Sequence, residues 1–136
     1  MKDAQKGLEF SKANLVEETV EGTTYWRADK TKPPTTKAMQ AFLLSIYDEY
    51  TIGYKDRSAL GEQRYFEKLI QMGNALTAVM VLDGRIVGTW KKETQQKQIK
   101  IKLNPFMQLE VEEREAFGRV VERYGKFFGS SAYVLD

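Results

Sequence analysis

The alternation of apolar and polar residues at the start of the chain predicts a short helix followed by two strands. The segments 15–20 and 23–28 have strand-like composition and flank Glu21-Gly22, a dipeptide that suits the positive φ of a tight turn. Residues 3–12 place a few apolar side chains among polar ones and predict the helix. Residues 29–37 contain two prolines, which cannot continue a sheet ladder, so they are predicted to form a loop.

The middle of the chain predicts one strand and one helix. Residues 39–46 form an apolar run broken only by Gln40 and Ser45, which indicates a mostly buried strand whose polar end starts at Asp48. Between residues 58 and 72 the apolar positions recur at spacings of three and four, which predicts a helix. Gly73-Asn74 is predicted to end that helix.

The last third of the chain predicts a meander and a terminal helix. Asp83-Gly84 joins segments 76–82 and 85–92 and is a strong hairpin signal. Residues 98–104 alternate strictly, with isoleucine and leucine on one face and lysine on the other. Apolar residues at helical spacing then run from about Glu110 until Gly129, which is predicted to stop the helix.

Together these elements predict an α+β domain. Its sheet is expected to be largely antiparallel and curved or barrel-like, with about six strands, a helix after the fourth-strand region and a C-terminal helix. Gly53 and Gly88 are candidate points of curvature. The length of 136 residues fits a single domain over 1–136.

Composition narrows the possible chemistry. The chain has no cysteine and no histidine, so disulfides, thiolate nucleophiles and the commonest metal ligand are excluded. Any catalysis would need carboxylates, tyrosine, lysine or a metal held by oxygen ligands, and we predict neither a metal nor a cofactor. The apolar runs are shorter than the ~20 residues that span a bilayer, and the N-terminus lacks a signal-peptide core, so we expect a cytoplasmic protein with no membrane partner.

The charge distribution is more informative than the total charge. The net charge of +2 and the pI near 8.7 are too mild to indicate nucleic-acid binding by themselves. Residues 91–102, however, contain five lysines against one acid, Glu93, a local charge of +4. These lysines are candidates for DNA phosphates: Lys91, Lys92, Lys97, Lys100 and Lys102. The alternative is that they protect a sheet edge from aggregation, because no aromatic residue is interleaved on the predicted lysine face.

Asp48, Glu49 and Tyr50 are the candidates for catalysis. A buried carboxylate beside a second acid can have a raised pKa and can position a water molecule. Adjacent side chains on a strand point to opposite faces, however, so Asp48 and Glu49 would share a pocket only beyond the end of the strand. In the structural alternative, one acid caps a turn or pairs with Arg57.

Further candidates for phosphate contacts are Tyr54, Lys55, Arg57 and Arg85. The arginine guanidinium can bind a phosphate through two parallel hydrogen bonds. A local network of Asp56 and Arg57 that holds the loop before the helix is the alternative. The large aromatic residues are predicted to pack in the core: Trp26, Trp90, Phe117, Tyr124, Phe127 and Phe128. For the two tryptophans the alternative is stacking on a base.

Three segments resemble, in order and spacing, the C-terminal half of the winged-helix DNA-binding family that includes the AlkZ-like DNA glycosylases. They are AFLLSIYDEYTIGYKDR, VLDGRIVGTWKK, and the helix that contains ERE and ends in RYGKFFG. The upstream DAQKGLE and EGTTYW also fit, so the resemblance covers essentially the whole chain. It implies a C-terminal β-barrel-like domain of a DNA-binding or DNA-repair protein.

In that family the winged helices and a catalytic Gln-x-Gln motif lie N-terminal to this region. The segment Gln96-Lys97-Gln98 has the letters of the motif but the wrong place in the family order, so the motif is not assigned to it. The resemblance thus implies an accessory domain that is non-catalytic in isolation and separated from its winged-helix partners. It also implies that DNA is a partner of the parent protein and that this chain alone binds it weakly.

Two alternatives belong to other functional classes. One is a small enzyme or ligand-binding barrel that uses Asp48, Glu49, Tyr50 and Arg57. The other is an interaction module whose exposed apolar strip leads it to self-associate as a homodimer.

Overall fold

The computed structural model describes residues 2–20, 22–30, 38–54, 56–71, 77–95 and 98–135. The chain divides into two compact units, Met1–Lys37 and Ala38–Asp136. That residues 1–136 form a single domain stays a prediction. Several predicted features lie outside the described residues: most of the 29–37 loop, Glu21, Lys55, Gly73-Asn74, Gln96 and Lys97.

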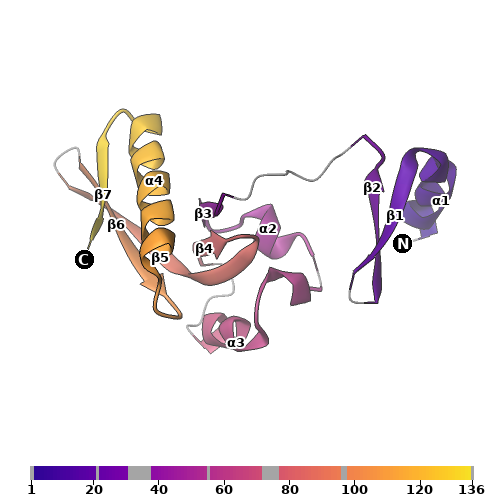
Figure 1. The fold of residues 1–136 in the computed structure, drawn as a ribbon, viewed down its shortest axis with the longest axis horizontal. Coiled ribbons are helices and arrows are strands. Elements are labelled where there is room, and N and C mark those ends of the chain that lie inside the picture. The colour runs from indigo at the N-terminus through magenta and orange to yellow at the C-terminus, as the bar shows by residue number, and fades with distance from the viewer. Residues whose placement is uncertain are drawn as a thin grey trace. The chain divides into compact units, whose positions relative to one another are not determined.

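The first unit contains a helix and a two-stranded antiparallel sheet (Figure 1). Its elements are α1 (Lys2–Ser11), the 3-10 turn η1 (Lys12–Asn14), β1 (Leu15–Val20) and β2 (Thr23–Ala28). Both strands have the predicted boundaries, and Gly22 has the positive φ, 79°, that was expected of it. The core prediction for Trp26 is wrong: its ring is half-buried, with the Lys12 ammonium 5.6 Å from the ring centroid.

The second unit is built on a five-stranded mixed sheet with the order β3-β4-β5-β6-β7. The strands are β3 (Ala41–Leu44), β4 (Val79–Leu82), β5 (Arg85–Gln95), β6 (Gln98–Pro105) and β7 (Ser131–Leu135). The helices are α2 (Glu49–Ile52), α3 (Gln63–Gln71) and α4 (Val111–Phe127), with a 3-10 turn η2 (Ser58–Leu60). Neighbouring strands are antiparallel except β6 and β7, which are parallel, so the predicted α+β class with a largely antiparallel, curved sheet is confirmed.

The β4–β5 hairpin forms as the sequence predicts. Asp83 and Gly84 have φ values of 46° and 76°, the left-handed conformations that a two-residue hairpin turn requires. The Asp83 carboxylate also accepts a hydrogen bond from the Gln40 backbone N–H at 2.7 Å, which ties the turn to the start of β3. The register of β4 against β5 shifts between Met80 and Val81, a bulge that bends the sheet.

Apolar side chains cover both faces of the sheet. Helix α4 covers one face (Figure 1), where its Phe117 and Val121 share a core cluster with Met80 and Ile101. On the opposite face, a second cluster contains Leu60, Leu69, Val79, Val81 and Ile86, from η2, α3, β4 and β5. Because successive strand side chains alternate between faces, the short strand β4 contributes to both clusters.

Trp90 lies in the core, as predicted, with 7% of its surface exposed. Its indole N–H donates to the Leu44 carbonyl at 2.8 Å, so the one polar atom of the buried ring is satisfied.

The end of α4 explains strand β7, which the sequence analysis missed. Gly129, with a φ of 61°, stops the helix as predicted. The Ser130 N–H donates to the Gly125 carbonyl at 3.0 Å, and the Gly129 N–H donates to the Lys126 carbonyl at 3.1 Å. These two bonds form a Schellman motif, which reverses the chain so that β7 runs back along β6. A Cβ on Gly125 would lie 2.8 Å from the Ala132 nitrogen, so the close packing of α4 on β7 requires glycine there.

Three other predictions differ from the structure. The predicted strand 39–46 is confined to Ala41–Leu44, because Tyr47 adopts a positive φ of 63° and turns the chain into α2. The predicted helix 58–72 begins as η2 and is interrupted at Gly61, whose φ is 149°. Phe127 and Phe128, predicted to be core residues, are 82% and 50% exposed, because they lie in the last turn of α4, beyond its contact with the core.

Among the described residues, no helix is long and apolar enough to cross a bilayer.

Candidate nucleic-acid interface

Asp48 caps helix α2 instead of ending a strand. Its carboxylate accepts a hydrogen bond from the Tyr50 N–H at 3.0 Å, and its carbonyl accepts from the Thr51 hydroxyl at 2.9 Å. The Tyr50 hydroxyl donates to the Gly84 carbonyl at 2.5 Å and thereby fixes α2 to the β4–β5 turn. Burial raises the pKa of Tyr50. Both Asp48 and Tyr50 thus have structural partners, whereas Glu49 is exposed.

A hollow of about 370 Å³ lies beside α2 and is lined by Glu49, Tyr50, Gly53 and Tyr54. Neither Asp48 nor Arg57 is among these lining residues. Arg57 is half-buried, and its buried Nε atom has no hydrogen-bond partner among the described residues. The enzyme alternative requires a carboxylate beside Arg57 in one pocket, and this hollow does not provide that arrangement.

The predicted network of Asp56 with Arg57 takes a different form. The Asp56 carboxylate accepts a hydrogen bond from the Ser58 N–H at 2.9 Å, which lowers the pKa of Asp56 and holds the start of η2. The loop is therefore organised by Asp56 and Ser58.

The β5–β6 pair places three lysines on one face of the sheet. In its register Lys91 is opposite Lys102, and Glu93 is opposite Lys100. Residues opposite each other in an antiparallel pair share a face, so these four side chains lie together. That face is turned away from α4, because the neighbouring residues Trp90 and Ile101 pack into the core beneath α4.

Lys92 does not belong to this group. It is opposite Ile101 and therefore lies on the α4 side of the sheet. Its ammonium is 5.3 Å from the centroid of the Phe128 ring, a cation–π contact that supports the end of α4.

Strand β7 adds an aromatic residue to the lysines. In the parallel β6–β7 register Tyr133 is beside Lys100, and 40% of its surface is exposed. We define the lysine face as Lys91, Lys100, Lys102 and Tyr133. The expectation that no aromatic residue lies among these lysines is wrong, because β7 pairs with β6 and brings Tyr133 beside Lys100. The segment SAYVL, which follows Ser130 and contains strand-favouring Tyr133 and Val134, is the signal that could have predicted this strand.

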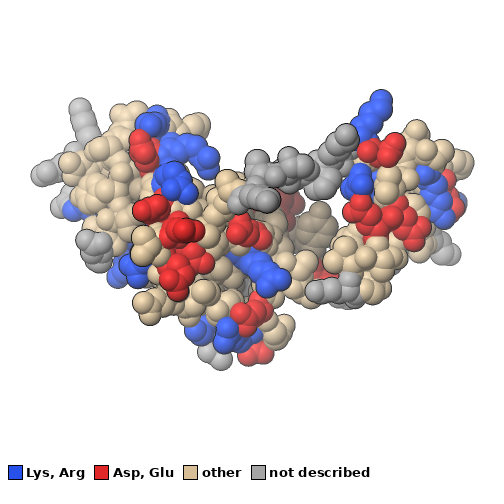
Figure 2. All heavy atoms as spheres, viewed as in Figure 1, with Lys and Arg blue, Asp and Glu red and all other residues tan. Residues whose placement is uncertain are grey.

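The other candidates are not gathered on the lysine face. Arg85 is exposed at the first position of β5, six residues before Lys91, which corresponds to ~20 Å along a strand. Tyr54 is 69% exposed beside α2. Figure 2 shows a different charge pattern over α4, with acidic residues around its beginning and basic residues around its end. That order complements the helix dipole.

A family model described as "DNA glycosylase AlkZ-like" matches residues 1–127, nearly the whole chain. The chain belongs to the AlkZ-like DNA glycosylase family. Among solved structures, the structure of this chain is similar to that of the Streptomyces sahachiroi DNA glycosylase AlkZ, with a TM-score of 0.64 and 19% sequence identity. At that identity the similarity shows the fold alone.

The match covers 98% of this AlkZ-like chain but only 37% of the AlkZ chain. The chain therefore spans little more than a third of that relative. A search of curated proteins found no match.

Proposed function

We propose that this chain is the accessory C-terminal domain of a DNA-binding or DNA-repair protein of the AlkZ-like family and is non-catalytic in isolation. Membership of that family is the observation that carries the proposal. The sequence resemblance adds the position of the domain, since the winged helices and the Gln-x-Gln motif lie upstream of this region in the family. A role in DNA repair is also compatible with the cytoplasmic location that the sequence predicts.

The lysine face is the proposed DNA contact. It contains Lys91, Lys100 and Lys102, and with the adjacent Glu93 included the net charge is three minus one, or +2. Lysines that neutralise phosphates release counterions, which supplies affinity without sequence specificity. Tyr133 adds a ring on which an unpaired base can stack. So few charges predict weak, salt-sensitive binding by the isolated chain.

A fluorescence-anisotropy titration tests this proposal. The full chain is titrated against a fluorescein-labelled duplex and its single strand at low and at moderate salt. We expect dissociation constants above the micromolar range that weaken further with salt. Sub-micromolar binding that resists salt would overturn the accessory role, as would base release from alkylated DNA by this chain alone.

Self-association is a second candidate, favoured by the exposure of Phe127 and Phe128. Their rings are in edge-to-face contact with centroids 5.1 Å apart and form an apolar surface at the end of α4. Sedimentation velocity at two protein concentrations distinguishes monomer from dimer. A sedimentation coefficient that does not change with concentration would exclude this candidate.

A further inference from the structure

A groove separates α4 from β3, the strand at one end of the sheet. Its volume is about 410 Å³, within the range of binding sites in proteins. The groove is lined by Met39, Gln40, Ala41, Phe42, Ala116, Arg119, Val120 and Arg123. Ala41 and Phe42 project to opposite faces of the sheet, yet both line the groove, so it runs along the backbone of β3.

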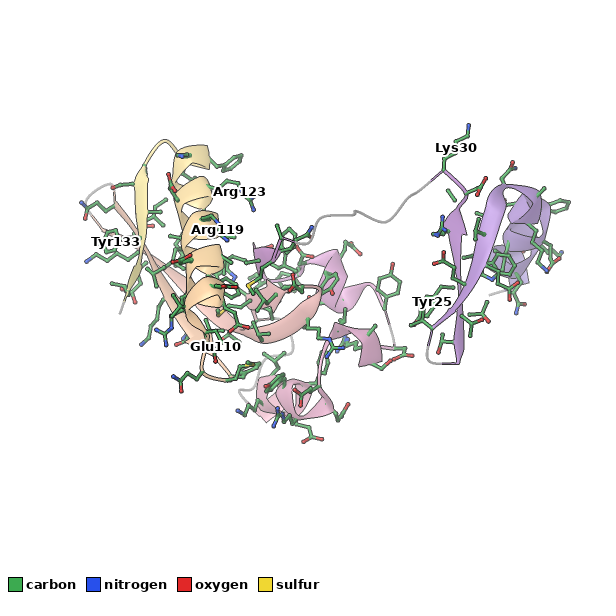
Figure 3. All side chains as sticks on the ribbon, viewed as in Figure 1. Tyr25, Lys30, Glu110, Arg119, Arg123 and Tyr133 are labelled. Carbon is green, nitrogen blue, oxygen red and sulfur yellow. The ribbon has the colours of Figure 1, made fainter. Side chains whose placement is uncertain are left out.

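Two arginines on the α4 side give the groove a positive charge. Arg119 and Arg123 are four residues apart, on the same face of the helix, and both are exposed. Figure 3 shows both side chains extending from the same side of α4, with Tyr133 on the other side of the helix. Adjacent like charges at this spacing are unfavourable unless an anion lies between them.

The acids of α4 do not neutralise these arginines. Glu115 precedes Arg119 by four residues, a spacing that favours an ion pair, but the two do not pair. Glu122 instead pairs with Lys126 at 2.7 Å. Among the described residues neither Arg119 nor Arg123 has an ion-pair or hydrogen-bond partner.

We propose that this groove binds an extended acidic peptide segment, which adds as a strand to β3 and places two carboxylates on Arg119 and Arg123. An end strand presents N–H and C=O groups that another strand can pair with. Each guanidinium can bind one carboxylate through two parallel hydrogen bonds.

The spacing of the two arginines selects the sequence of the peptide. Four residues of α-helix advance by ~6 Å, and two residues of an extended strand advance by ~6.6 Å. When the added strand runs along α4, acids at positions i and i+2 of the peptide align with Arg119 and Arg123. The residue between them points to the opposite side, where the half-exposed Phe42 favours an apolar side chain. The expected core is Glu-Val-Glu or a similar sequence.

The groove suits a peptide better than a nucleic acid. A sugar-phosphate chain has no regularly spaced N–H donors for the carbonyls of β3, whereas a peptide backbone has them. The apolar lining from Met39, Ala116 and Val120 also accommodates the methylene groups of glutamate side chains. The groove is separate from the lysine face, so this inference does not depend on the proposed DNA contact.

The test uses the full chain and two fluorescein-labelled peptides of identical composition. One carries Glu-Val-Glu in a threonine-rich extended sequence, and the other carries Glu-Glu-Val, which directs its carboxylates to opposite sides of the strand. We expect the first peptide to bind at least about ten-fold more tightly than the second, and R119A/R123A to cause a loss of similar size. The matched control K91A/K102A removes the same charge from the lysine face and should leave peptide binding unchanged.

Hydrogen exchange supplies an independent readout. Addition of a strand should protect backbone amides within Ala41–Leu44 when the Glu-Val-Glu peptide is present. Equal affinity for the two peptides, equal losses in the two double variants, or unchanged exchange in β3 would each overturn the proposal. Single-stranded DNA binding that R119A/R123A abolishes, without peptide binding, would assign the groove to nucleic acid instead.

Discussion

Substitution of both Lys91 and Lys102 by alanine should make DNA binding much less dependent on salt concentration. The two lysines are opposite each other on the lysine face, and Lys100 is the remaining described cation there. If each of the three lysines neutralises one phosphate of a duplex, the logarithm of affinity falls with the logarithm of salt with a slope of about −2.7. The K91A/K102A variant keeps one contact and a slope of about −0.9.

These slopes translate into a measurable difference. Between about 50 and about 200 mM salt the wild-type affinity should fall about 40-fold, and that of K91A/K102A about 3.5-fold. The assay is fluorescence anisotropy with one labelled duplex at four or five salt concentrations. The control is R119A/R123A, which also removes two positive charges but leaves the lysine face intact. Equal slopes for the two variants would refute the assignment of DNA contact to the lysine face and leave only a general effect of net charge.

Other measurements test individual side chains. Y133A should weaken single-stranded DNA by about 1–3 kcal/mol and duplex DNA much less, because only an unpaired base can stack on the ring; equal losses by anisotropy would contradict stacking. F117A should cost about 3–5 kcal/mol in urea unfolding, since Phe117 is fully buried, and F127A less than about 0.5 kcal/mol. Burial raises the pKa of Tyr50 above 10.0, so its contribution is complete below that pH and is lost as the pH rises through the folded-state pKa. The stability difference of about 1 kcal/mol between wild type and Y50F should therefore shrink above pH ~10, and a difference independent of pH would contradict this.

The sequence alone predicted the features that depend on residues close together in the chain, namely hairpins, turns and helix ends. Residues 15–28 form a hairpin, and Asp83-Gly84 forms a tight turn, because alternation and turn conformation depend on neighbours in the chain. The stop of α4 at Gly129 follows from the same kind of local signal. The family resemblance, carried by long motifs, also came from the sequence and is confirmed by the family match over residues 1–127.

The tertiary structure alone decided which distant residues meet. Tyr133 lies beside Lys100 only because β7 pairs in parallel with β6, a contact across more than thirty residues that no local pattern encodes. Likewise, Arg119 and Arg123 form a groove only because α4 packs next to the end strand β3. Periodicity identifies the face of an element, but the packing of the whole core determines what that face opposes.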